Sequence, residues 1–244
     1  MFTKLFTKAA VAGAMLLAAQ AASAATYDFK AAANAGGGVG ESIFSTFSTS
    51  ASGGTFGGFS GPNLDITASA AGDDDPAQYV YFDNGNAGIG VCKDPTGGAP
   101  IGSYTDGGGN ICNPGSDDGI TALLETLTFT ATDTAVVIQS IWLNANHDTP
   151  DVRDASYMIN GTLYDFSDMI TDSLSGSGDV RIDLDFTLGV GDSFTLFAVS
   201  GSPDSYISGI ALAAVPLPAA CLLLLGALGA LGGLGTARRR RKAT

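Results

Sequence analysis

The stretch DVRIDLDFTL, residues 179–188, constrains the fold of this chain more than any other segment. Apolar residues occupy every second position from Val180 to Leu188, and charged or polar residues occupy the positions between them. Side chains of a β-strand point alternately to the two faces of a sheet. The alternation therefore predicts a strand of an antiparallel sheet, with one face buried and the other in water.

Four other segments predict further strands: ETLTFTA, AVVIQSIWLNA, DSFTLFAVS and SYISGIALAA. Turn-rich segments separate these strands at short intervals, which is the pattern of a β-sandwich or barrel. In the second segment Val136, Ile138, Ser140 and Trp142 fall on the same face of the strand. This spacing predicts that the only tryptophan of the chain lies in the core.

Two Asn-Gly pairs predict tight β-hairpins. Asn84-Gly85 separates two β-rich runs in AQYVYFDNGNAGIGVC, and Asn160-Gly161 does the same in SYMINGTLYDF. Asn-Gly is the pair that two-residue hairpin turns favour, because both central residues need a positive φ. Residues 160–162 also match a glycosylation sequon, but the turn accounts for the pair without any modification.

The composition favours strands and turns over helices. The chain has 34 glycines and 24 acidic residues, and Glu41 and Glu125 are the only glutamates among them. Aspartate favours turns, whereas glutamate favours helices. We therefore predict an all-β protein, an antiparallel, jelly-roll-like β-sandwich over residues 25–214. Four phenylalanines are expected to anchor the Gly- and Ser-rich segment 31–61 to its core: Phe44, Phe47, Phe56 and Phe59.

Residues 1–24 have the three parts of a secretory signal peptide. Lys4 and Lys8 give a positive start, AAVAGAMLLAAQAA is apolar, and Ala22-Ser23-Ala24 is a small-residue cleavage site. We expect the following body, residues 25–214, to be exported across the inner membrane.

The other end of the chain predicts a membrane anchor. Residues 217–237 carry no charge over a length that crosses a bilayer as a helix. A basic cluster follows directly: Arg238, Arg239, Arg240 and Arg241. Because the body is exported, this cluster is expected to stop the tail on the cytoplasmic side of the membrane.

The sequence VPLPA stands at the start of this apolar segment. The motif consists of Val215, Pro216, Leu217, Pro218 and Ala219. The order of motif, membrane helix and arginine cluster resembles the VPLPA variant of the PEP-CTERM sorting signals of Gram-negative bacteria. The resemblance covers residues 215–244. It implies that an exosortase-type membrane protease removes the helix and passes the body to the cell surface, outer envelope or extracellular space.

The exported body is strongly acidic. Between the signal and the tail the basic residues are Lys30, Lys93, Arg153 and Arg181, so 4 positive against 24 negative charges leaves −20. Nucleic-acid binding needs clustered Lys and Arg on one surface. The charge therefore excludes nucleic acid as a partner.

The body shows no recognisable catalytic constellation. His147 is the only histidine, which excludes metal sites built on several histidines. The sequence contains no G-x-S-x-G elbow, P-loop or H-E-x-x-H motif. We predict that the protein is not an enzyme. The open alternative is a hydrolase whose carboxylate pair is not distinguished among the many aspartates.

Two acidic loops suggest calcium as the one metal to consider. The carboxylates concerned are Asp73, Asp74, Asp75, Asp148 and Asp151. Hard carboxylate oxygens suit a hard cation, although no EF-hand ladder is present and solvated surface loops explain the same residues. A carbohydrate-binding module is an alternative of the same class, with six tyrosines that serve equally well as core residues: Tyr79, Tyr81, Tyr104, Tyr157, Tyr164 and Tyr206.

Cys92 and Cys112 are expected to form a disulfide. They are the only cysteines of the body, since Cys221 falls in the predicted membrane helix. Export places both in an oxidising compartment, where disulfides persist. The segment between them is rich in Gly and Pro and has little core of its own. The function we expect is that of a structural or adhesive envelope protein, and the resemblance of the tail implies a setting in exopolysaccharide or biofilm matrix.

Overall fold

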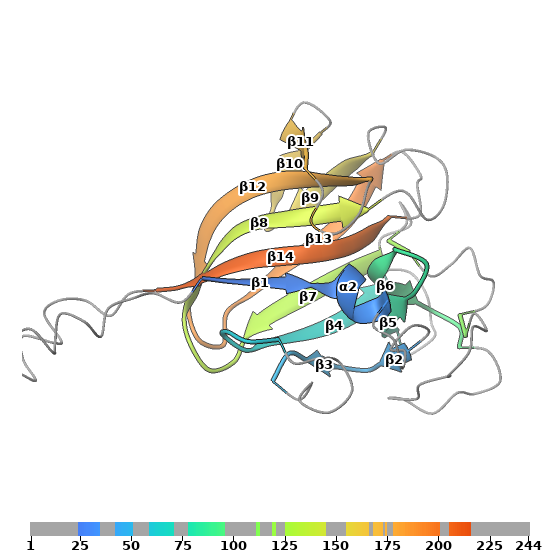
Figure 1. Cartoon of the computed structure of the whole chain (residues 1–244), viewed down its shortest axis with the longest axis horizontal. Coiled ribbons are helices and arrows are strands. Elements are labelled where there is room, and N and C mark those ends of the chain that lie inside the picture. The colour runs from blue at the N-terminus through green and yellow to red at the C-terminus, as the bar shows by residue number, and fades with distance from the viewer. Residues whose placement is uncertain are drawn as a thin grey trace, which may run out of the picture. The chain divides into compact units, whose positions relative to one another are not determined.

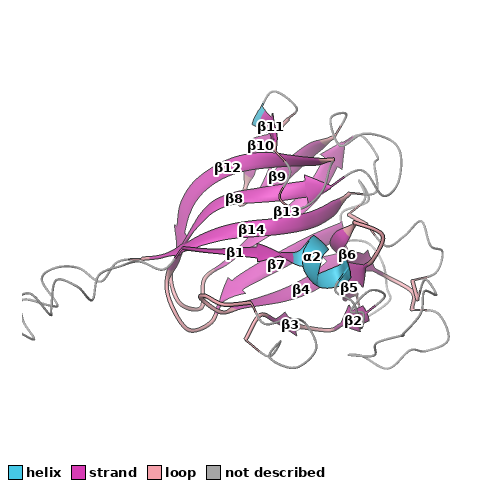
Figure 2. Ribbon diagram, in the orientation of Figure 1, coloured by secondary structure: helices cyan, strands magenta, loops and turns pink. Residues whose placement is uncertain are grey.

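The computed structural model describes residues 24–34, 42–50, 59–70, 78–95, 111–112, 119–120, 125–144, 155–165, 168–172, 174, 178–200 and 205–215. Most of these residues lie in antiparallel strands, which form two sheets (Figures 1 and 2). The predicted all-β antiparallel fold is confirmed, and its two sheets give it a sandwich-like architecture.

The first sheet has eight strands, and the last strand of the fold lies in its middle. In spatial order the sheet contains β11 (Met169–Thr171), β12 (Asp179–Leu188), β8 (Val136–Asn144), β14 (Tyr206–Ala214), β6 (Gly88–Cys92), β5 (Tyr79–Asp83) and β2 (Ser42–Phe44). The eighth strand, β1 (Ala24–Asp28), pairs with β14. One edge of β14 is therefore shared between β6 and β1.

The second sheet has six strands. Its spatial order is β10 (Thr162–Tyr164), β9 (Ser156–Ile159), β13 (Ser193–Ser200), β7 (Glu125–Ala131), β4 (Leu64–Ala70) and β3 (Phe47–Ser48). On β7 every second residue is buried, as expected for a strand with one face on the core.

Apolar side chains of both sheets form one large core. Phe129 of β7 stacks on Phe194 of β13 with ring centroids 4.8 Å apart. Phe47 lies 4.7 Å from Phe82 of the first sheet, measured between ring centroids. Phe44 and Phe59 pack against the same core, so three of the four anchoring phenylalanines are confirmed, and Phe56 lies outside the described residues.

Both predicted hairpins are confirmed. β9 pairs with β10 across the two-residue turn Asn160-Gly161. β5 pairs with β6 across a longer loop, residues 84–87, in which Gly85 and Asn86 have the positive φ values and Asn84 does not. Asn160 and Gly161 have φ values of 49° and 77°, the left-handed conformation that asparagine and glycine tolerate. Asn160 is exposed because it lies in this turn.

The prediction that Trp142 lies in the core is confirmed, because its side chain is buried. The main core nevertheless takes Ile141 and Leu143 from this part of β8. The pairing with β14 shifts where Ala211 pairs with Ser140. Before this irregularity the main core takes Val136 and Ile138, and beyond it the main core takes Ile141 and Leu143, so the alternation along β8 shifts by one residue.

The strand that dominated the sequence pattern also contains an irregularity. β12 pairs with β8 along its length, but the register shifts between Asp183 and Phe186. Asp185 has a φ of 65°, which is the local geometry of a β-bulge. Leu184 and Phe186 are consequently only half-buried, whereas Val180 and Leu188 are buried.

A short helix, α2 (Phe29–Asn34), follows β1 and was not predicted. Asp28 caps it, because the backbone N–H of Ala31 donates to Asp28 Oδ1 over 2.7 Å. Phe29, Lys30, Ala32 and Ala33 are buried, so the helix covers part of the core with one face. Aspartate before an alanine-rich run was the local signal for this helix.

The predicted ends of the chain lie almost wholly outside the described residues, which include only Ala24 of the signal peptide and Val215 of the tail. Within the part of the chain that the structure describes, no helix has the length and apolarity needed to span a membrane. Residues 217–237, the predicted membrane helix, are not among those described.

The buried tyrosines predict a loss of stability at alkaline pH. Burial raises the pKa of Tyr27 and of Tyr157 from 10.0 to about 12. Because the unfolded chain loses these protons first, their contribution to stability is complete below pH 10 and falls as the pH rises toward 12. We expect the urea midpoint to decrease across this window. The decrease should be smaller in Tyr157→Phe, and an equal decrease in that variant would assign the effect to other groups.

Candidate functional site

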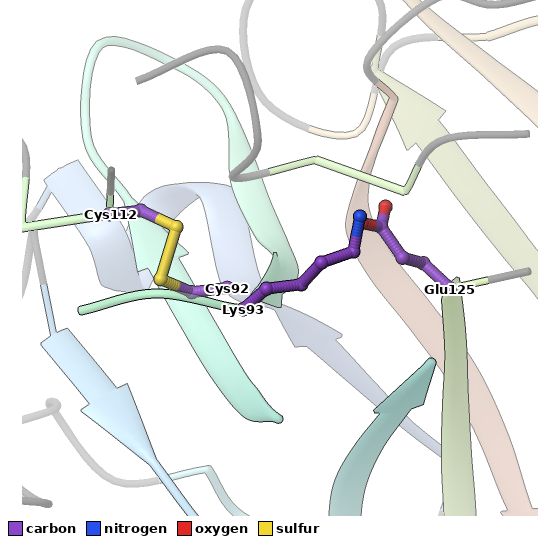
Figure 3. Close-up of a disulfide and its surroundings, with 4 residues drawn as sticks. All are labelled: Cys92, Lys93, Cys112 and Glu125. Carbon is purple, nitrogen blue, oxygen red and sulfur yellow. A yellow bond between two sulfur atoms is a disulfide. The ribbon is translucent and has the colours of Figure 1, made fainter. Parts of the chain in front are cut away.

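The disulfide joins the end of β6 to a segment that follows it by a sequence separation of 20. Cys92 and Cys112 are bonded with Cα atoms 5.6 Å apart, which confirms the predicted pairing (Figure 3). Both cysteines are buried in a small second core together with Ile43, Tyr81 and Ile111. The bridge therefore holds the segment around Ile111 against the outer part of the first sheet.

An ion pair with a buried carboxylate lies beside the disulfide. Lys93 follows Cys92 directly, and its side chain extends away from the disulfide toward Glu125 (Figure 3). Lys93 Nζ lies 2.6 Å from Glu125 Oε1, and the glutamate side chain is fully buried. Because Lys93 follows a strand of the first sheet and Glu125 begins β7 of the second, the pair connects the two sheets. No local pattern around Lys93 or Glu125 signals this pairing.

The first strand of the fold begins beside the end of the last strand. β1 and β14 are antiparallel neighbours, and Ala24 pairs with Ala213 (Figure 1). Val215, the first residue of the predicted sorting motif, follows β14 directly and is half-buried. The predicted signal-cleavage site and the predicted sorting motif therefore adjoin the same end of the β1–β14 pair.

Strand β1 is fixed tightly in the sheet. Tyr27 is 1% exposed, and its hydroxyl donates a hydrogen bond to the carbonyl oxygen of Pro62. Gly209 of β14 faces Tyr27, because a Cβ at Gly209 would lie 2.7 Å from the Tyr27 carbonyl oxygen. The close approach of the two backbones requires glycine at this position.

The structure does not describe the two acidic loops. Asp73, Asp74, Asp75, Asp148 and Asp151, the predicted calcium ligands, all lie outside the described residues. Within the described ranges, no group of three or more His, Cys, Asp or Glu side chains is placed to hold a metal ion.

Most of the tyrosines considered for sugar binding are core residues. Tyr81, Tyr157 and Tyr206 are fully buried and offer no ring to a ligand. Tyr79 and Tyr164 are half-buried, and Tyr104 lies outside the described residues. Three of the six tyrosines are therefore core residues, which is the alternative to sugar binding.

Comparisons of the chain with protein-family profiles, with curated proteins and with solved structures find no match.

Proposed function

We propose that the chain is an exported structural or adhesive β-protein that is sorted to the cell envelope through its C-terminal segment. In this proposal residues 1–24 are the signal peptide, residues 25–214 are a jelly-roll-like body, and residues 217–237 span the inner membrane before processing. An exosortase-type protease acts at the VPLPA motif, and the arginine cluster keeps the tail on the cytoplasmic side. The mature body is placed at the cell surface, in the outer envelope or in an extracellular polysaccharide matrix.

The pairing of β1 with β14 is the observation that supports this proposal best. The compact unit of the fold runs from Ala24 to Ala214, so both predicted processing sites fall at its borders. The register Ala24–Ala213 places these borders next to each other. A body with this arrangement remains attached to one membrane by both segments during export. When both segments are removed it keeps every strand, and β1 loses only its first residue, Ala24.

The use of aromatic residues favours a structural role over sugar binding. A sugar-binding surface needs exposed aromatic rings, but most of the described aromatic side chains are buried in the core. The buried disulfide adds the kind of stabilisation that proteins outside the cell use. Binding to a panel of glycans on an array, with half-maximal signal in the micromolar range, would favour the carbohydrate-binding alternative instead.

The proposal predicts processing at the motif. Intact-mass analysis of the surface or secreted protein should show that everything beyond the VPLPA region has been lost. Replacing Pro216 and Pro218 by alanine should leave the tail attached and hold the protein in the membrane fraction. A matched control, Arg239→Lys, keeps the charge that the tail needs and should be processed normally.

A mature surface protein that still carries the segment from Arg238 to Lys242 would contradict the proposal. In that case the tail is an ordinary anchor, and the motif has no role in sorting.

A further inference from the structure

A second buried ion pair joins the beginning of the fold to its last third. Lys30 Nζ on α2 lies 3.1 Å from Asp179 Oδ1 and 3.2 Å from Oδ2. The side chains are 1% and 0% exposed, although the two residues are 149 positions apart. The nitrogen is nearly equidistant from both oxygens, so it faces the carboxylate group as a whole and not one oxygen alone.

The backbone of Leu174 completes this site. Its N–H donates to Asp179 Oδ2 over 3.1 Å, whereas Oδ1 receives no hydrogen bond from this group. The Leu174 side chain lies against Gly209, where any Cβ would collide with it. Among the described residues, the two carboxyl oxygens of Asp179 therefore have different environments, because Oδ2 accepts a hydrogen bond from a backbone donor and Oδ1 does not.

We propose that Lys30 and Asp179 form an intramolecular amide crosslink. One proton passes from the Lys30 ammonium to Oδ1 of the carboxylate, and the resulting amine attacks the Asp179 carboxyl carbon. A second proton then moves from the nitrogen to the Oδ1 hydroxyl, the bond from Cγ to Oδ1 breaks, and one water leaves. The new bond joins Lys30 Nζ to Asp179 Cγ, and Oδ2 becomes the amide oxygen.

The surroundings favour this reaction in three ways. The fold holds nucleophile and electrophile together, and well-oriented intramolecular partners reach effective concentrations of about 10⁵ M or more. The Leu174 N–H stabilises the negative charge that develops on Oδ2 during attack. The product is neutral, so the crosslink removes two charges from a site where burying ions costs free energy.

The position of the crosslink matters for an exported protein. Lys30 follows β1 almost directly, and Asp179 begins β12 on the other side of β8 and β14. A covalent bond between them closes the chain across the middle of the first sheet. The segment beside the processing site at Ala24 would then resist pulling and proteolysis.

The test is peptide mapping of the full chain after export, reduction and digestion with trypsin. The peptide of residues 154–181, which contains Asp179, should be joined to the peptide that contains Lys30. Trypsin should not cut after Lys30, and the joined mass should equal the sum of the two peptides less one water. Detection of the two peptides only in linear form, with complete cleavage after Lys30, would overturn the proposal.

Three variants locate the bond, with circular dichroism confirming that each is folded. Lys30→Arg keeps the positive charge but removes the nucleophile, so peptide 154–181 should become linear. Lys93→Arg alters the other buried pair and should leave the crosslink intact. Asp179→Asn should yield the same product by releasing ammonia in place of water, and a linear peptide in this folded variant would contradict attack at Asp179 Cγ.

Discussion

Replacing Lys93 by methionine is expected to lower the free energy of unfolding by about 3 kcal/mol. Lys93 Nζ lies 2.6 Å from Glu125 Oε1, and the glutamate side chain is 0% exposed. Methionine keeps the length and apolar stem of lysine but removes the ammonium. Glu125 then loses this cation in a position that bulk water does not reach. Removing one partner of a buried pair is strongly destabilising for this reason.

Arg181→Met is the matched control for this prediction. Arg181 forms ion pairs with Asp172 and Asp183, and its own side chain is 30% exposed. Water screens such pairs, so their loss should cost at most about 1 kcal/mol. Urea unfolding of the wild type and both variants measures the difference, provided that the slope of each transition is unchanged. Equal losses of unfolding free energy in the two variants would show that burial of the Lys93–Glu125 pair does not increase its contribution to stability.

Local patterns were sufficient to predict most of the strands and both hairpins. The alternation from Val180 to Leu188 reflects a strand with one face on the core, and the pair Asn160-Gly161 supplies the φ values that its hairpin turn needs. These features depend on neighbours in the sequence. They can therefore be inferred without knowing which strands pair.

The irregularities of the sheet depend on pairing and were not predictable in the same way. The register between β8 and β14 shifts near Ser140, and this shift decides which face of β8 meets the core. Nothing in the segment from Val136 to Trp142 signals the shift. A strict period of two would continue the face of Val136 and Ile138 to Trp142, which is buried, whereas the main core takes Ile141 and Leu143.

Both buried ion pairs were missed for a related reason. Lys30 and Asp179 are 149 residues apart, and Lys93 meets Glu125 only because the two sheets face each other. A lone lysine or aspartate has no local pattern that marks it as buried. The disulfide could be predicted because the body contains only two cysteines. Each cysteine therefore has one possible partner, and the pairing follows without knowledge of the fold.

The disulfide between Cys92 and Cys112 is expected to contribute about 3 kcal/mol to the free energy of unfolding. The double variant Cys92→Ala/Cys112→Ala should lose this contribution. The bond closes a loop with a sequence separation of 20, which restricts the unfolded chain more than the folded one. The native backbone should change little, because both positions lie in a small apolar core that accepts alanine. Urea unfolding of residues 25–214 with and without reductant measures the loss.

Reductant separates the bond from the packing of the two side chains. Reducing the wild type should lower its unfolding midpoint close to that of the double variant, and the variant itself should not respond to reductant. A wild type that keeps its midpoint after full reduction would show that the bond adds no stability. A large drop in the variant alone would instead assign the effect to the cavity left beside Tyr81 and Ile111, because these side chains pack against the cysteines.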